Sequence, residues 1–422
     1  MKNPRVGMVV VFLSLLVGGG IYYSRRPNPQ QIHLAAARDA EARFDFDDAL
    51  NHLGRYARTR PNHPEYRLEL ARLARRGGDY DRARQEMLEY EGLAGTTPAG
   101  KLEHELLQAQ LGQLDAVEKP LVQQVEAGHP DSDAIREALM RGQIRVYRLP
   151  SAMYWAEQLL ERHPHHVPAL LAQGMMFESV GNTDAAVTSY ETALANYPHH
   201  FQARLNLGEV LLRINRPLEA QPHFVALYGQ NKMNPDVALG YARSLHALGD
   251  NLPAATVVDQ LLLHQPALPH AHALRGRIAL DLNDLPAAER HLQQAIVRLP
   301  ADREIHMTLA SCLRQLDKTQ EADQVLNRAM QIDADLKLLA AASDRAVNAP
   351  SDPKPKHDAG VICLRNGQHG QAVRWFSGAL QIDPKYKPTH AALATYYTSI
   401  GSGDLADKHR RLAELAAGPA SP

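Results

Sequence analysis

A repeat with a period of about 34 residues is the feature that most constrains how this chain can fold. Residues 181–198 read GNTDAAVTSYETALANYP, and residues 283–300 read NDLPAAERHLQQAIVRLP. Alanines, a large apolar residue and a closing proline recur at the same places, and the offset of 102 residues is three times 34. A fixed period of this length is typical of an array of small stacked units rather than of one globular core.

The repeat can be followed along the chain in eleven windows of equal length. They begin at residues 30, 64, 99, 133, 167, 201, 235, 269, 303, 353 and 387, with one inserted residue at Pro98 and a 16-residue interruption at 337–352. Position 20 of the window is alanine in ten of the eleven, with Glu118 as the exception. Position 8 is glycine or alanine in nine windows, and position 32 is proline in seven. Matches in one phase predict that each window is the same structural unit.

Each of these preferences has a physical cause. Small residues at positions 8 and 20 let two helices approach each other closely. Glycine at position 15, as at Gly78, Gly181 and Gly249, can take the left-handed backbone that ends a helix. Proline at position 32 ends the second helix because it cannot continue one. We therefore expect a pair of helices per window, with large apolar residues at position 24 filling the space between neighbouring repeats.

In these features the chain resembles the tetratricopeptide repeat family over residues 30–420. The resemblance implies an all-α fold, a right-handed α-solenoid of about eleven repeats, whose concave face holds a peptide or a partner protein. It implies no catalysis and no cofactor. Bacterial membrane-anchored proteins of this family are similar in layout. The chain departs from the family at position 4, where His33, Arg67, Arg136 and Arg204 replace a large aromatic residue.

The windows predict four segments. Residues 1–29 form a membrane anchor, residues 30–336 hold nine repeats, residues 337–352 interrupt the stack, and residues 353–420 hold a C-terminal pair of repeats. The interruption is expected to extend the second helix of the ninth repeat and then to turn. Prolines at positions 350, 353 and 355 forbid a continuous helix there.

The N-terminal segment is expected to anchor the chain in a cell membrane. Residues 6–23 carry no charge, and a helix of this length spans about 27 Å, close to the hydrocarbon thickness of a bilayer. A cleaved signal peptide is the alternative, but the segment lacks a small-x-small cleavage site. The prediction is a single-pass protein whose repeats lie on the extracytoplasmic (periplasmic) side. Arg25 and Arg26 oppose that orientation, since positive charge favours the cytoplasmic side.

Composition and motifs argue against several classes of function. The formal net charge of −1 gives no sign of a nucleic-acid partner. The two cysteines form no C-x-x-C motif, which excludes zinc-ribbon and thioredoxin-type sites, whereas a disulfide between Cys312 and Cys363 stays open. There is no G-x-S-x-G, H-E-x-x-H or Gly-rich phosphate loop. We therefore predict no catalytic residues, no cofactor and no small-molecule substrate.

The 21 histidines leave one alternative function open. HPHH at 163–166 and YPHH at 197–200 look like clusters of metal ligands, which a cell-envelope enzyme or a metal-binding accessory protein could use. Both stretches fall in the loop after a second helix, a loop that recurs in every repeat. Their spacing supplies no further ligand. We interpret them as solvated loop residues and predict no metal site.

Arginine is concentrated at positions 9, 12 and 13 of the window. In the family that the chain resembles, these positions lie on the first helix and face the concave side. The predicted partner-binding residues are Arg72, Arg141, Arg145, Arg213, Arg243, Arg277 and Arg314. Because the planar guanidinium group suits carboxylates, the predicted partner is an acidic protein segment. The alternative is that these arginines pair with Asp and Glu of neighbouring repeats or are simply solvated.

Overall fold

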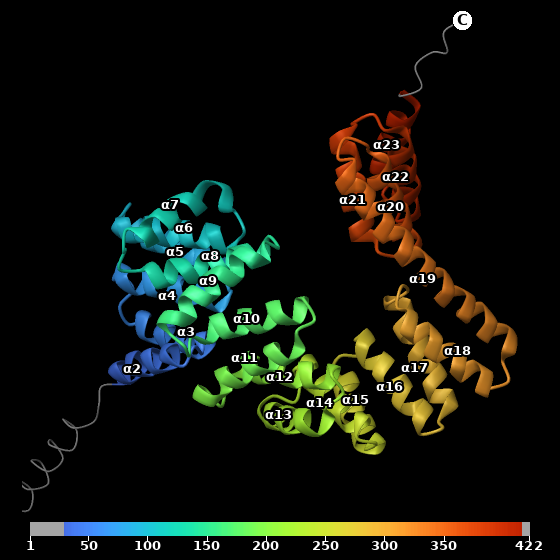
Figure 1. Ribbon diagram of the computed structural model, residues 1–422, viewed down its shortest axis with the longest axis horizontal. Helices are drawn as coiled ribbons and strands as arrows, with labels where there is room; N and C mark the ends of the chain where they lie inside the picture. Colours follow the sequence, from blue (N-terminus) through green and yellow to red (C-terminus); the bar gives the residue numbers. More distant parts are fainter. Residues whose placement is uncertain (1–28, 416–422) are drawn as a thin grey trace, which may run out of the picture. The chain divides into compact units, whose positions relative to one another are not determined.

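The computed structural model describes residues 29–415, which form α-helices joined by short turns, without a strand in that range. The predicted anchor at 6–23 lies outside the described residues. None of the helices between residues 29 and 415 is both long and apolar enough to cross a membrane. The chain divides into two compact units, residues 1–223 and 224–422 (Figure 1).

In the first unit, consecutive helices form pairs and the pairs stack on one another. The helices are α2 (Pro29–Ala42), α3 (Phe46–Ala57), α4 (Pro64–Gly77), α5 (Tyr80–Ala94), α6 (Pro98–Gln110), α7 (Leu114–Glu126), α8 (Ser132–Arg145), α9 (Leu149–Arg162), α10 (Val167–Ser179), α11 (Thr183–Asn196) and α12 (Phe201–Arg213). Helix α13 (Pro217–Gln230) crosses the boundary between the units.

The second unit repeats the same arrangement of paired helices. Its helices are α14 (Pro235–Ala247), α15 (Asn251–His264), α16 (Pro269–Asp281), α17 (Leu285–Arg298), α18 (Arg303–Gln315), α19 (Thr319–Asn348), α20 (Lys354–Arg365), α21 (His369–Ile382), α22 (Lys387–Ser399) and α23 (Gly403–Leu415). The all-α class is confirmed for the described residues, and each unit is built as an α-solenoid is. The right-handed winding stays a prediction.

A residue with a positive φ angle ends the first helix of each described pair. Asn and Asp tolerate this left-handed backbone better than other residues with a side chain, and glycine adopts it at no steric cost. The positions are Phe44, Gly78, Gly112, Tyr147, Gly181, Asn215, Gly249, Asn283, Asp317, Gly367 and Gly401. Each follows the one before it by one window length, except after Gly112 and after Asp317. The turns therefore recur with the period of the sequence repeat.

The structure corrects the position of the inserted residue. Pro98 is not an insertion, because it begins α6 as Pro64 begins α4, and Gly112 follows Gly78 by one full window. The extra residue lies between Val117 and Tyr147 instead. In the corrected register Val117, which is buried, occupies position 20 in place of Glu118. In the corrected register this position holds a buried apolar residue in the third repeat too, although it is a valine instead of an alanine.

Glycine at position 8 lets the first helix of a repeat lie directly against the large side chain at position 24. A Cβ atom at Gly174 would overlap the ring of Tyr190, and one at Gly360 would overlap the ring of Phe376. Both rings are fully buried. The predicted close approach of the two helices is confirmed at these repeats.

Helix α19 is 30 residues long and includes most of the stretch that interrupts the repeats. Residues 337–348 continue the helix, and the chain turns at residues 349–353 before α20 begins. Within α19 the carboxylate of Asp335 is buried and accepts hydrogen bonds from the side chains of Arg365 and Asn366. These bonds join α19 to the C-terminal end of α20. The division into four segments itself stays a prediction.

Replacing Tyr147 by glycine should stabilise the first unit. Tyr147 has a φ angle of 62° and its side chain is 80% exposed, so the strained backbone is offset by few contacts. We expect Tyr147→Gly to raise the free energy of unfolding by about 1 kcal/mol, measured by urea denaturation of the full chain. Asn215→Gly, at the equivalent turn, should change it by only a few tenths. An unchanged midpoint for Tyr147→Gly would contradict this account of the turn.

Candidate functional site

The seven predicted arginines lie on the first helices of their repeats, but they belong to different units. Arg72 lies on α4, Arg141 and Arg145 lie on α8, and Arg213 lies on α12, all in the first unit. Helices α14, α16 and α18 of the second unit carry the others: Arg243, Arg277 and Arg314. The structure therefore divides the seven residues between the two units.

In the first unit, the arginines of α4 take part in a buried cluster of charges. The Arg75 guanidinium donates from Nε to Glu103 Oε1 at 2.5 Å, and the two residues are 1% and 2% exposed. Nε of Arg72 lies 3.8 Å from the second oxygen of the same carboxylate. A buried ion pair of this kind is strongly sensitive to the loss of one partner. Arg72 therefore has an internal partner.

Arg141 also has internal partners. Its guanidinium donates to the main-chain carbonyl of Arg76 at 2.6 Å and lies 3.0 Å from Glu137. Arg76 in turn contacts Glu137 at 3.3 Å and Glu41 at 2.9 Å. Burial alone would raise the pKa of Glu137, but Arg76 and Arg141 hold this pKa well below its ordinary value. These contacts join α2, α4 and α8.

The other two arginines of the first unit lie nearer the surface. The Arg145 guanidinium lies over the ring of Tyr80, 5.6 Å from its centre, in a cation–π contact. Arg213 pairs with Glu178 of the preceding repeat at 2.5 Å, and its side chain is 54% exposed. Of the two alternatives that the sequence left open, pairing with carboxylates of neighbouring repeats is present here.

The arginines of the second unit form pairs that are open to solvent. Arg277 lies 2.7 Å from Glu304, and Arg314 lies 3.5 Å from Asp323. All four side chains are at least 41% exposed. Arg243 is exposed and donates to the carbonyl of Leu239. Exposed pairs of this kind contribute about 0–1 kcal/mol, so a competing carboxylate could replace the internal one at little cost.

The histidine loops have structural partners. His166 and His200 cap α10 and α12, because their Nδ1 atoms accept from the amides of Ala169 and Ala203 at 3.3 and 3.2 Å. His163 pairs with Asp133 at 2.7 Å. Among the described residues there is no group of three or more His, Cys, Asp and Glu that could hold a metal ion. Cys312 and Cys363 are buried and free.

Pairs of histidines at one constant spacing join the two helices of three repeats. Their Nδ1 atoms face each other at 2.8–3.0 Å, in His33–His52, His272–His291 and His390–His409. Nε2 of His272 also donates to the carbonyl of Pro266 at 2.9 Å. Arg67 and Glu86 occupy the same two positions of the second repeat. The constant sequence separation is the signal by which the sequence could have revealed these pairs.

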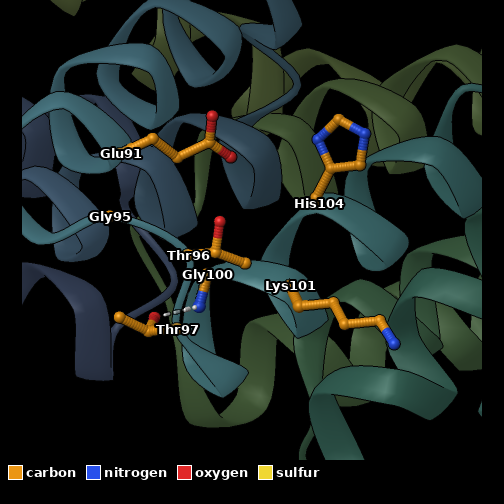
Figure 2. A pocket seen from close by; sticks show the side chains of 7 residues that line it. All are labelled: Glu91, Gly95, Thr96, Thr97, Gly100, Lys101 and His104. Carbon is orange, nitrogen blue, oxygen red and sulfur yellow. Dashed lines mark hydrogen bonds between the residues drawn. The ribbon is translucent and has the colours of Figure 1, made fainter.

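Figure 2 shows a pocket of about 180 Å³ between the end of α5 and the start of α6. The segment GTTPAGK, residues 95–101, has the G-x-x-x-x-G-K spacing of a phosphate loop. However, Leu102 stands where that motif has Ser or Thr, and the segment links two helices instead of a strand and a helix. The Thr97 hydroxyl already accepts from the Gly100 amide at 3.0 Å. The residues of this segment cap the start of α6.

Comparison with known proteins agrees with the helix pairs. A family model described as tetratricopeptide repeat matches residues 34–98, 171–220 and 273–337. No curated protein matches the chain in sequence.

Several solved structures are similar to the chain. A tetratricopeptide repeat protein from Parabacteroides merdae is 14% identical, covers 64% of this chain and 93% of its own, and has a TM-score of 0.42. PilW, a type IV pilus biogenesis factor, is 20% identical over 49% of this chain and 92% of its own, with a TM-score of 0.40. YrrB, a TPR protein with an unusual peptide-binding site, is 17% identical over 44% and 94%, with a TM-score of 0.39.

The stacked helix pairs define an all-α repeat protein, and the matched segments fall in both units. The matched segments have the sequence pattern of tetratricopeptide repeats.

The buried pair of Arg75 and Glu103 should be needed for the stability of the first unit. Glu103→Gln leaves the Arg75 charge buried without a counter-charge, so we expect a loss of about 3 kcal/mol in urea denaturation. The matched control is Arg84→Gln. Arg84 pairs with Asp81 at the surface, and its replacement should cost less than about 1 kcal/mol. Equal effects of the two changes would contradict the internal role of the cluster.

The second unit should lose stability as the pH falls from 6.5 to 4. Burial, and then the charges of His272, Arg275 and Arg290, lower the pKa of His291 to about 4. In the unfolded chain this histidine binds a proton near pH 6.5. The stabilisation that neutral His291 gives the folded state is therefore complete above pH 6.5 and is lost as the pH falls towards 4. His291→Gln should weaken the dependence of the urea midpoint on pH between 6.5 and 4, whereas replacement of the exposed His264 should not. A slope unchanged in His291→Gln would contradict the assignment.

Proposed function

We propose that this chain is a protein-interaction scaffold that holds a peptide or a partner protein on its tetratricopeptide repeats. The observation that carries the proposal is the set of exposed charged side chains on the first helices of the second unit. There Arg277 and Arg314 stand on neighbouring repeats with solvent-open partners. Side chains in such pairs are available for exchange with a ligand at little cost.

The proposed ligand of this surface is an acidic segment. An incoming carboxylate can replace Glu304 at Arg277 and Asp323 at Arg314, since a guanidinium group binds carboxylates in two parallel hydrogen bonds. Arg243, in the same unit, is exposed as well and completes the proposed set. Arg72 and Arg141 have internal carboxylate partners that include buried Glu103 and Glu137. We assign them a role in stability instead of in ligand binding.

We also propose that residues 6–23 anchor the scaffold in a cell membrane, with the repeats on the extracytoplasmic side. The support is the absence of charge throughout this segment, whose length fits a bilayer. A reporter enzyme fused after Pro422 and active only in an oxidising compartment should be active. Activity of a reporter that works only in the cytoplasm would contradict the orientation.

Capture of the native partner should depend on the exposed arginines. We expect the double variant Arg277→Gln, Arg314→Gln to retain its helical signal and to lose about fivefold in partner captured by cross-linking from native membranes. Capture by the wild-type chain should also fall as salt is added.

The matched control carries Arg303→Gln and Arg345→Gln, which remove two exposed ion pairs of the same unit at other positions. It should capture the partner as the wild type does. Equal losses in both variants, or capture that is insensitive to salt, would overturn the proposal of an acidic ligand.

A further inference from the structure

The turn between α2 and α3 carries an aromatic side chain, as the Tyr147 turn also does, at the position where the other described repeats have glycine, asparagine or aspartate. Phe44 has a φ angle of 59°, and the turn is closed by the bonds Phe44 N–H to Glu41 O and Asp45 N–H to Ala40 O, both 2.9 Å. A left-handed backbone costs a residue with a Cβ atom about 1–2 kcal/mol. The contacts of the Phe44 ring must offset that cost.

Those contacts lie far along the chain, beyond the second and third repeats. The Phe44 ring meets His166 edge to face at 5.2 Å between centres, and Tyr197 at 5.5 Å. It also packs against the buried cluster that contains Val167 and Leu170. In a regular stack each repeat touches only its neighbours. Here the turn of the first repeat touches the ends of the fourth and fifth, all within the first unit.

The surface that receives the turn is built from the two histidine loops, 163–166 and 197–200, and we call it the loop edge. Its imidazoles are fixed because His166 and His200 cap helices through Nδ1. Burial lowers the pKa of His200, while the Asp45 charge and a hydrogen bond with the Phe44 backbone raise it. The edge thus contacts an aromatic ring, and the residue that follows this ring in the chain carries a carboxylate that caps α3.

Charged groups hold the other side of the turn. The Arg76 guanidinium lies 5.9 Å from the centre of the Phe44 ring and 4.7 Å from that of Phe46. It also pairs with Glu41, on α2, at 2.9 Å. These contacts are few, and Phe44 itself is only half-buried. A turn held by so small a surface can leave the loop edge locally, while α3 stays packed against α4 in a buried apolar cluster.

We propose that the loop edge is a docking site for a protein segment in which an aromatic residue is followed by an acidic one. The Phe44–Asp45 turn of the first repeat occupies this site within the same chain, and a partner segment of the same chemistry binds by displacing it. The site uses the loops of the first unit and is independent of the exposed arginines of the second. The histidine loops thereby gain a role in recognition that needs no metal.

The test uses the full-length chain and a fluorescent peptide with the sequence of residues 38–50, RDAEARFDFDDAL. Phe44→Ala empties the ring position, so this variant should bind the peptide at least about tenfold more tightly than the wild type. A peptide with alanine in place of Phe44 should not bind. Adding Tyr197→Ala to the variant chain should abolish binding, because Tyr197 supplies one wall of the site.

A second measurement covers the case in which Phe44→Ala disturbs the fold. An excess of the peptide added to the wild-type chain should raise hydrogen exchange in residues 29–57 and leave exchange in α6 and α7 unchanged. The proposal is overturned if a fully helical Phe44→Ala chain binds both peptides equally or neither, or if the peptide leaves exchange in residues 29–57 unaffected. A wild-type dimer that Phe44→Ala abolishes would assign the edge to a second copy and also overturn it.

Discussion

The close contact between the two helices of a repeat is the constraint on which the rest of the structure depends. At Gly174 and Gly360 there is no room for a Cβ atom beside the ring that packs against the glycine. This contact fixes which face of the first helix is buried, and so which positions remain for charged groups. The left-handed residue that follows the helix, which recurs once in each repeat, then sets the direction of the second helix.

The two units use their inner charges in different ways. In the first unit Arg75 and Arg76 lie against buried carboxylates, and Arg76 also receives the turn of the first repeat. In the second unit Arg277 and Arg314 keep solvent-open partners. The same residue type on first helices thus has buried carboxylate partners in one unit and solvent-open partners in the other. Burial of the partner carboxylate makes the difference, because desolvation makes a buried pair costly to break.

The sequence predicted the features that follow from periodicity and could not predict those that depend on contacts between distant repeats. The helix pairs, the small residues and the continuation of α19 follow from residue type and spacing. The pairing of Arg141 with the Arg76 carbonyl joins the first helices of the second and fourth repeats, and no local pattern signals it. The same is true of Phe44, whose aromatic ring at a turn position was visible but whose contacts with His166 and Tyr197 were not.

Two errors have clear physical reasons. Pro98 resembles an insertion in the sequence because prolines usually mark the end of the second helix, whereas here it begins a first helix, where its missing N–H is not needed. The sequence predicts solvated histidine loops, because both stretches fall in the turn after a second helix that recurs in every repeat. In the structure, His166 and His200 accept backbone amides as helix caps, a use that residue type alone does not reveal.

The most direct test of the close-contact account compares two glycine-to-alanine changes in the first unit. Gly92 lies in α5 with open space around it, whereas Gly174 lies against Tyr190. Alanine normally stabilises a helix by about 0.5–1 kcal/mol relative to glycine. The account predicts that Gly92→Ala raises the urea midpoint of the full chain and that Gly174→Ala lowers it. If Gly174→Ala raised the midpoint as much as Gly92→Ala does, the close contact would not be what holds the helix pair together.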